Sequence, residues 1–113
     1  MPAPSFADFE AFWPYYLNEH SDPRNRALHF AGTATALAVA ATAVVTLNPL
    51  LLAALPVVGY GPAWVGHFII EKNRPATFIH PLWSLRGDLR MFRLMATGQL
   101  GPHLERARAA FVG

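Results

Sequence analysis

The chain has 113 residues, of which 53% are hydrophobic and only 14% are charged, against about 45–50% and about 25% in soluble domains. A chain of this length forms one domain, expected over residues 1–113, and its small net charge of +2 argues against nucleic acid as a partner. It contains no cysteine, which excludes disulfides, thiolate catalysis and cysteine-based zinc sites.

The first expected element is an amphipathic helix over residues 5–19. Ser5 can cap its N-terminus. Apolar side chains then recur at helical spacing, namely Phe6, Phe9, Trp13, Tyr16 and Leu17. Aromatic side chains at this density are typical of the membrane–water interface. We therefore expect an interfacial helix, the alternative being a helix whose rings face an ordinary core.

The centre of the chain carries no Asp, Glu, Lys or Arg over the 44 residues from Ala27 to Ile70. As helix these residues would span about 66 Å, enough for two crossings of a hydrocarbon core about 30 Å thick. We expect crossings over 27–47 and 50–71, joined by a turn at Asn48-Pro49, with Pro and Gly residues kinking or breaking the second. The alternative, a soluble four-helix bundle, would have to bury all 44 uncharged residues in a small globule.

Two further helices are expected after the hairpin, a basic amphipathic helix over 82–97 and a short tail helix over 103–112. The first is typical of a helix lying on a membrane surface, the alternative being a solvated face of a soluble helix. Basic residues flank the hairpin and its turn has none, which predicts that both termini lie in the cytoplasm. The expected fold is an all-α integral membrane hairpin with flanking interfacial helices, inserted by the hairpin itself rather than by a signal peptide.

Four histidines fall at one end of the expected hairpin. His29 lies 19 positions before Asn48 and His67 lies 19 after it, so an antiparallel pair of helices places them level. His20 and His80 flank the mouth of the hairpin on the same side. A single histidine there is ordinarily a hydrogen-bonded interfacial residue. Four together, in a chain without cysteine, predict a metal site.

Glu71 follows His67 by four positions, so the two share a face if the helix continues. It could be a metal ligand, an acceptor that orients an imidazole N–H, or a base. Alternatively, it pairs with Lys72 or Arg74 at the helix end. His103 lies in the tail and is expected to be a surface residue without partners.

The stretches YLNEHSDPRNRALHFAGT and GHFIIEKNRPATFIHPLWSLRGDLRMF together resemble the family of membrane 2-hydroxy fatty acid dioxygenases. The pattern is H-x8-H, then GH-x3-E-x-NRPA and HP, within a region from His20 to Phe92. The resemblance implies an Fe(II)-dependent enzyme of α-oxidation that uses O₂ to cleave a long-chain 2-hydroxy fatty acid to a fatty acid one carbon shorter. It also implies the metal ligands His20, His29, His67 and His80.

With four histidines available we expect an all-histidine site, and Glu71 is the candidate if a carboxylate is used. The candidate substrate-binding residues are Lys72, Arg74, Asn25 and Asn73, although an isolated Asn can equally form a turn. The acyl tail is expected along the second crossing. A short, Ala- and Arg-rich chain suggests a bacterial member in the inner membrane, with its metal site on the cytoplasmic side.

Two other functions remain open at this point. One is a non-catalytic membrane protein that binds lipid or scaffolds partners, and the other is a zinc-dependent membrane hydrolase. The expected partners are the 2-hydroxy fatty acid, O₂ and membrane lipid, and the chain could also associate into a homo-oligomer. The sequence also leaves open the chain length of the substrate and whether one or two metal ions bind.

Overall fold

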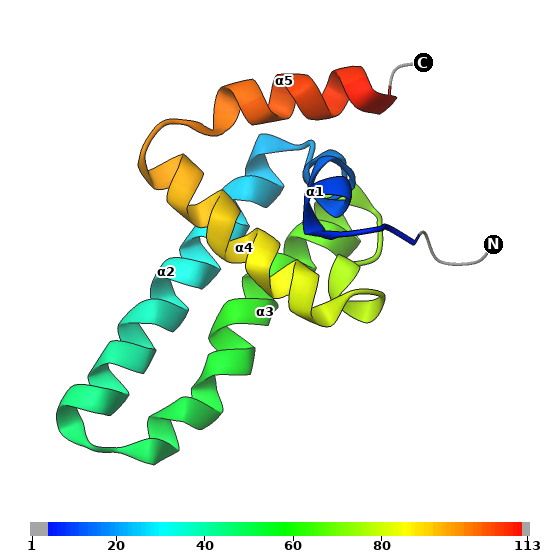
Figure 1. The fold of residues 1–113 in the computed structure, drawn as a ribbon. Coiled ribbons are helices and arrows are strands. Elements are labelled where there is room, and N and C mark those ends of the chain that lie inside the picture. The colour runs from blue at the N-terminus through cyan, green and yellow to red at the C-terminus, as the bar shows by residue number, and fades with distance from the viewer. Residues whose placement is uncertain (1–4, 112–113) are drawn as a thin grey trace.

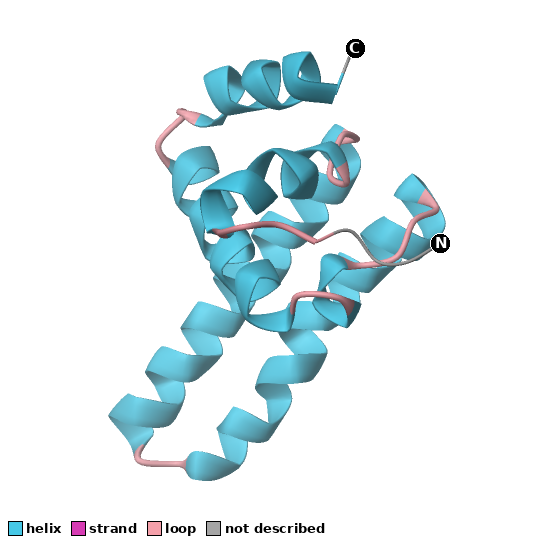
Figure 2. Ribbon diagram, turned by 45° about the vertical axis from the view of Figure 1, so that its right-hand side comes forward, coloured by secondary structure: helices cyan, strands magenta, loops and turns pink. Residues whose placement is uncertain are grey.

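The computed structural model describes residues 5–111 and contains only helices in this part of the chain (Figures 1 and 2). In chain order the elements are α1 (Phe9–Asn18), α2 (Pro23–Thr46), η1 (Pro49–Ala54), α3 (Leu55–Val65), η2 (Gly66–Glu71), η3 (Ala76–Phe78), α4 (Pro81–Ala96) and α5 (Leu100–Phe111). Helices α1, α2 and α5 begin at Phe9, Pro23 and Leu100 rather than at residues 5, 27 and 103. The predicted all-α fold around a hairpin of two apolar helices is confirmed.

Local capping explains where the hairpin begins and turns. Asp22 caps α2 and is followed by Pro23, whose missing N–H costs nothing at the first helical position. After α2, Leu47 adopts a left-handed conformation with φ 54°. The side chain of Asn48 then caps η1, with Pro49 at its first position. The chain thus reverses direction at the predicted Asn48-Pro49 turn.

The second crossing consists of three kinds of helix. A 3₁₀ segment, η1, leads into the α-helix α3, and a π-helix, η2, completes the crossing. The prolines and glycines from Pro56 to Pro62, where a kink or break was expected, lie inside α3. Pro56 is tolerated because it sits in the first turn of that helix, where no N–H partner is lost. The departures from α geometry lie at the two ends of the crossing, and the π-helix carries His67.

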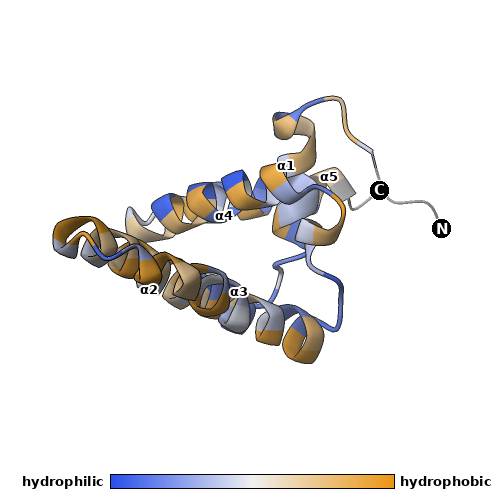
Figure 3. Ribbon diagram, turned by 90° about the horizontal axis from the view of Figure 1, so that it is seen from below, coloured by the Kyte–Doolittle hydropathy of each residue, from blue (hydrophilic) through white to orange (hydrophobic). Residues whose placement is uncertain are grey.

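Both crossings are long and apolar enough to span a membrane, with mean hydropathies of 1.7 and 1.4. Only 17% and 11% of their most apolar windows are buried within the protein. Large side chains such as Val45 and Leu47 are 82% and 86% exposed. Figure 3 shows the hydrophobic colour along much of α2 and α3. A soluble bundle would cover this surface, so the exposed hairpin fits a lipid environment better than the soluble alternative.

The main core lies at the open end of the hairpin, between α1, α4 and α5. Its buried members are Phe9, Phe12, Trp13, Tyr16, Leu17, Ala76, Met91, Leu94, Leu100 and Ala107. The side chains of α1 that were expected at the membrane–water interface therefore pack inside the protein. The alternative expectation, that the rings of this helix face an ordinary core, is the one that holds for this face of α1.

Helix α4 separates this core from the hairpin. Its buried face consists of Ser84, Gly87, Met91 and Leu94. Leu85 and Leu89 are about half exposed and face a cavity beside the hairpin. Arg86 and Arg90 lie over the ring of Phe9, at 4.1 and 4.7 Å from its centroid, so these arginines contact protein. Helix α4 thus packs Met91 and Leu94 into the core with α1 and α5, while Leu85 and Leu89 face the hairpin.

Candidate metal centre

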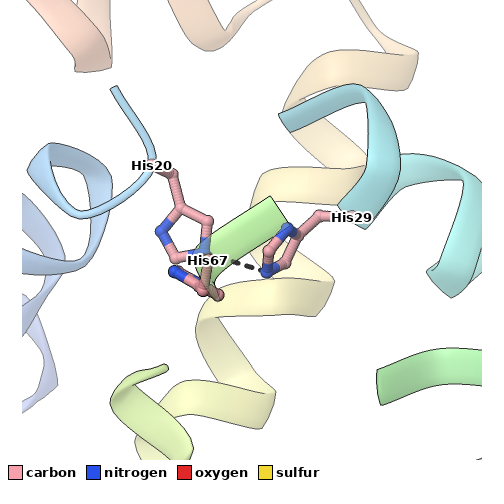
Figure 4. Close-up of side chains that lie close together, drawn as sticks. All are labelled: His20, His29 and His67. Atoms are coloured by element: carbon pink, nitrogen blue, oxygen red, sulfur yellow. Dashed lines mark hydrogen bonds between the residues drawn. The ribbon is translucent and has the colours of Figure 1, made fainter. Parts of the chain in front are cut away.

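Three imidazoles from three segments meet inside the protein at the open end of the hairpin (Figure 4). His20 follows α1, His29 lies in the second turn of α2, and His67 lies in η2. Nε2 of His20 is 3.0 Å from Nε2 of His29 and 3.0 Å from Nε2 of His67. All three side chains are buried, and their candidate ligand atoms lie within 4.8 Å of one another.

Two of these rings are oriented by backbone carbonyls four residues earlier. His20 Nδ1 is 2.6 Å from the Tyr16 carbonyl oxygen, and His29 Nδ1 is 3.0 Å from that of Asn25. The Tyr16 carbonyl is in the last turn of α1, where carbonyls lack an intrahelical N–H partner. Because a carbonyl oxygen only accepts, each Nδ1 carries the hydrogen and each Nε2 keeps its lone pair.

The third ring is oriented by a side-chain amide. His67 Nδ1 is 2.7 Å from Asn73 Oδ1. The amide nitrogen of Asn73 donates to the carbonyl and the carboxylate of Glu19, at 3.0 and 2.6 Å. Since both of those partners only accept, the amide must present its oxygen to His67. The Nδ1 of this ring therefore also carries the hydrogen.

Three Nε2 lone pairs thus converge with no hydrogen between them, an unfavourable contact unless a cation lies among them. Two nitrogens bound to one ion at about 2.0–2.1 Å and at right angles to each other would be about 2.8–3.0 Å apart, which matches the spacing of His20 Nε2 from each of the other two. Burial holds the pKa of His20 well below its ordinary value, and the neighbouring His29 and His67 act in the same direction. Neutral imidazoles whose Nδ1–H groups are anchored to oxygens are a donor set suited to iron or zinc.

A family model described as "2-hydroxy-palmitic acid dioxygenase Mpo1-like" matches residues 6–100. The chain belongs to the Mpo1-like family. Comparison with curated proteins and with solved structures gives no match. The matched region contains all three clustered histidines, and the description of the family is that of a dioxygenase. The resemblance seen in the sequence is confirmed.

In this Mpo1-like chain Glu71 lies beside the centre, but its carboxylate faces the turn that carries His20. It accepts hydrogen bonds from the backbone N–H of Asp22 at 2.5 Å and from the hydroxyl of Ser21 at 3.2 Å. The side-chain amide of Asn25 lies 3.4 Å from the same carboxylate. These contacts let Glu71 hold the His20 turn against the end of the second crossing.

Two other histidines lie outside this group of three. The ring of His80 packs against the rings of Phe12 and Trp83, with centroids 5.5 and 5.0 Å away. It does not join the other three imidazoles, which form the metal-competent group among the described residues. The expectation that His103 has no partner is wrong. The indole N–H of Trp13 donates to His103 Nδ1 at 3.1 Å, which ties α5 to α1.

The four residues expected to bind substrate fall into two pairs. Asn25 and Asn73 each provide the oxygen that orients one imidazole. Lys72 and Arg74 are exposed at the end of the second crossing. The guanidinium of Arg74 lies 5.5 Å from the centroid of the Phe78 ring. The backbone carbonyl of Asn25 and the side-chain amide of Asn73 thus orient imidazoles of the candidate centre, whereas the exposed Lys72 and Arg74 orient none of the three rings.

Sequence reasoning missed three residues that support the centre. The ring of Tyr16 stacks on that of His20 with centroids 4.1 Å apart, and its hydroxyl donates to Asp88. The guanidinium of Arg26 donates to the carbonyl oxygens of His20 and Ser21, at 2.7 and 2.9 Å. The i, i+4 spacing of Tyr16 and His20 was available as a signal. Asp88 could not be found in this way, because it lies 72 positions from Tyr16.

Gly66 brings the second crossing into contact with α2 next to the centre. A Cβ added there would lie 1.8 Å from Oδ1 of the fully buried Asn25. We expect Gly66→Ala to push His67 away from His29, destabilising the protein by about 1–3 kcal/mol and weakening metal binding. Thermal unfolding in detergent and metal titration measure both effects.

Gly61→Ala is the matched control, because an added Cβ there meets no described atom within 4 Å. Replacing a helical glycine by alanine should stabilise α3 by up to about 1 kcal/mol, with metal binding unchanged. Equal losses in the two variants would show that the contact between Gly66 and Asn25 is not what positions the centre.

Proposed function

We propose that the protein is an Fe(II)-dependent dioxygenase that cleaves a long-chain 2-hydroxy fatty acid to the fatty acid one carbon shorter. The observation that carries the proposal is the convergence of three Nε2 lone pairs from buried, neutral imidazoles in a chain of the Mpo1-like family. Three protein ligands with open positions are typical of non-haem Fe(II) oxygenases. A three-histidine site also suits zinc, and the description of the family favours iron because a dioxygenase must activate O₂.

The proposed reaction balances with one O₂ and no external reductant: R–CH(OH)–COOH + O₂ → R–COOH + CO₂ + H₂O. The C1–C2 bond breaks, C1 leaves as carbon dioxide, and C2 becomes the new carboxyl carbon. The substrate loses four electrons in this change, the number that one O₂ accepts. An Fe(II) ion bound by the imidazoles would supply the redox chemistry that O₂ activation requires.

The residues of the chain orient the site and exclude water from it. The carbonyls of Tyr16 and Asn25 and the amide of Asn73 keep the three Nδ1 atoms protonated and their rings fixed. The ring of Tyr16 covers one face of His20. At the exposed end of the second crossing, Lys72 supplies a positive charge that would attract the substrate carboxylate.

In this proposal the hairpin spans a bacterial inner membrane and the metal centre lies on its cytoplasmic side. Basic residues lie in the first turn of the first crossing at Arg24 and follow the second at Lys72 and Arg74, while the turn at Asn48 carries none. The positive-inside tendency then favours the cytoplasm for the end that holds the three histidines.

The test combines metal content with O₂ consumption. Protein purified without oxygen should contain close to one iron per chain and should consume O₂ with 2-hydroxypalmitate, releasing the 15-carbon acid. Zinc in place of iron, with hydrolysis and no O₂ uptake, would support the hydrolase instead. Fully metallated protein that consumes no O₂ with 2-hydroxy acids of several chain lengths would support the non-catalytic lipid-binding alternative.

A further inference from the structure

A cavity of about 330 Å³ lies between the hairpin and α4, a size within the range of small-molecule sites. All three helices contribute apolar side chains to its wall, among them Ala36 and Ala40 of α2, Leu55 and Tyr60 of α3, and Leu85 and Leu89 of α4. In the membrane-spanning orientation the cavity lies at the depth of the hydrocarbon core. It is distinct from the three-histidine group, none of whose members lines it.

The cavity and the metal centre nevertheless lie on the same faces of the two crossings. On α2, His29 is followed at helical spacing by Thr33 and Ala40, both of which line the cavity. On the second crossing, Tyr60 lines the cavity and precedes His67 by seven positions, about two turns. Each crossing therefore carries a histidine at its cytoplasmic end and cavity lining on the same face below it.

We propose that this cavity binds the acyl chain of the 2-hydroxy fatty acid, with the head group at the three histidines and the methyl end near Ala40 and Leu55. The inference rests on the proposed function and names the part of the substrate that the cavity takes. From His29 to Ala40 is eleven positions, or about 16 Å of helix. One leaflet of a hydrocarbon core about 30 Å thick is about 15 Å deep. The available length is thus that of one long acyl chain of a membrane lipid.

Asp88 distinguishes the polar end of the cavity. It is the only acidic or basic side chain among the described residues that line the wall, and it accepts a hydrogen bond from the hydroxyl of Tyr16. Tyr16 in turn stacks on His20, so a single side chain separates Asp88 from the metal centre. Burial raises the pKa of Asp88 to about 7, against the opposing hydrogen bond from Tyr16. A substrate chain therefore meets a carboxyl group with a reduced charge at this end, and the rest of the wall is apolar apart from the side chains of Thr33 and Tyr60.

Photolabelling locates the acyl chain directly. The probe is a 16-carbon 2-hydroxy acid with a diazirine at its methyl end, added to anaerobically purified protein in phospholipid nanodiscs. Labelling is expected near Ala40 and Leu55, to saturate at one probe per chain, and to disappear with excess 2-hydroxypalmitate. A phospholipid with the same diazirine should instead label outward residues such as Val45 and Val57. If the 2-hydroxy probe labels only those outward residues and is not displaced, the cavity proposal is overturned.

Filling the end of the cavity far from the histidines tests whether the cavity limits the length of the acyl chain that binds. Ala40→Leu should weaken binding of the 16-carbon acid by about 10-fold or more while changing that of the 12-carbon acid little, because a few methylene groups lose their space. Ala38→Leu is the same substitution on the same helix at an exposed position that does not line the cavity. It should change neither affinity. Equal binding of the two acids by both variants would contradict the proposal.

The outcomes separate this inference from the proposed function. Saturable labelling of the cavity without O₂ uptake would overturn the dioxygenase and keep the acyl-chain site. O₂ uptake with labelling only at outward residues would overturn the acyl-chain site and keep the dioxygenase.

Discussion

The His67→Ala protein is expected to bind iron at least about 100-fold more weakly than the wild type and to consume no O₂ with 2-hydroxypalmitate above background. Loss of a residue that merely orients a metal ligand costs about 10–100-fold in affinity, so loss of a ligand itself should cost at least the upper value. His67 is one of three buried imidazoles whose ligand atoms lie within 4.8 Å of one another, and the two remaining rings would hold the ion poorly. Metal titration of anaerobically purified protein measures the effect, with circular dichroism to verify the helix content.

Two histidines outside the cluster provide the controls. His103→Ala removes the hydrogen bond from Trp13 and should leave the iron content unchanged. His80→Ala removes the fourth ligand that the family resemblance implies. Because this ring packs among aromatic side chains outside the group of three, the iron content should again be unchanged. Iron retained by His67→Ala at wild-type affinity would contradict the assignment of the centre. Iron lost equally from the His103 variant would show that the effect is one of folding.

The hairpin and the meeting of the histidines could be predicted because both depend on counting. A charge-free run of 44 residues is long enough for two crossings and too long for one. With the turn at Asn48, equal separations from that residue place His29 and His67 at the same level, and the structure brings the two rings together with His20. Topology alone carries this information, and no side-chain conformation is needed.

The remaining features depend on geometry that periodicity does not encode. The i, i+4 relation of His67 and Glu71 assumes an α-helix, whereas a π-helix spans Gly66–Glu71 and the carboxylate contacts the His20 turn. His80 follows a short 3₁₀ turn after Pro75, whose direction could not be computed from spacing. The rings of α1 pack inward because α4 and α5 fold over them, which involves contacts distant in sequence.

The Asn73→Ala variant tests whether the orientation of a ligand, and not only its presence, determines metal affinity. The substitution leaves the His67 residue unchanged but removes the side-chain oxygen of Asn73 that accepts the His67 Nδ1–H. It also removes the donor to Glu19, so two contacts between the end of the second crossing and the end of α1 are lost. An unpaired buried N–H costs about 1–3 kcal/mol, and the freed ring can turn its Nε2 away from the other two. We expect iron to bind about 10–100-fold more weakly.

Asn48→Ala is the matched control for this prediction, since it also removes an Asn side chain that accepts a hydrogen bond. Asn48 accepts from the backbone N–H of Leu50 in the hairpin turn, at the opposite end from the histidines. Its loss should cost about 0.5–2 kcal/mol of stability, as for other helix caps, without changing the affinity for iron. If Asn73→Ala binds iron as tightly as Asn48→Ala does, the amide does not position His67. A weaker affinity in the Asn73 variant alone, at equal thermal stability, separates orientation of the ligand from general destabilisation.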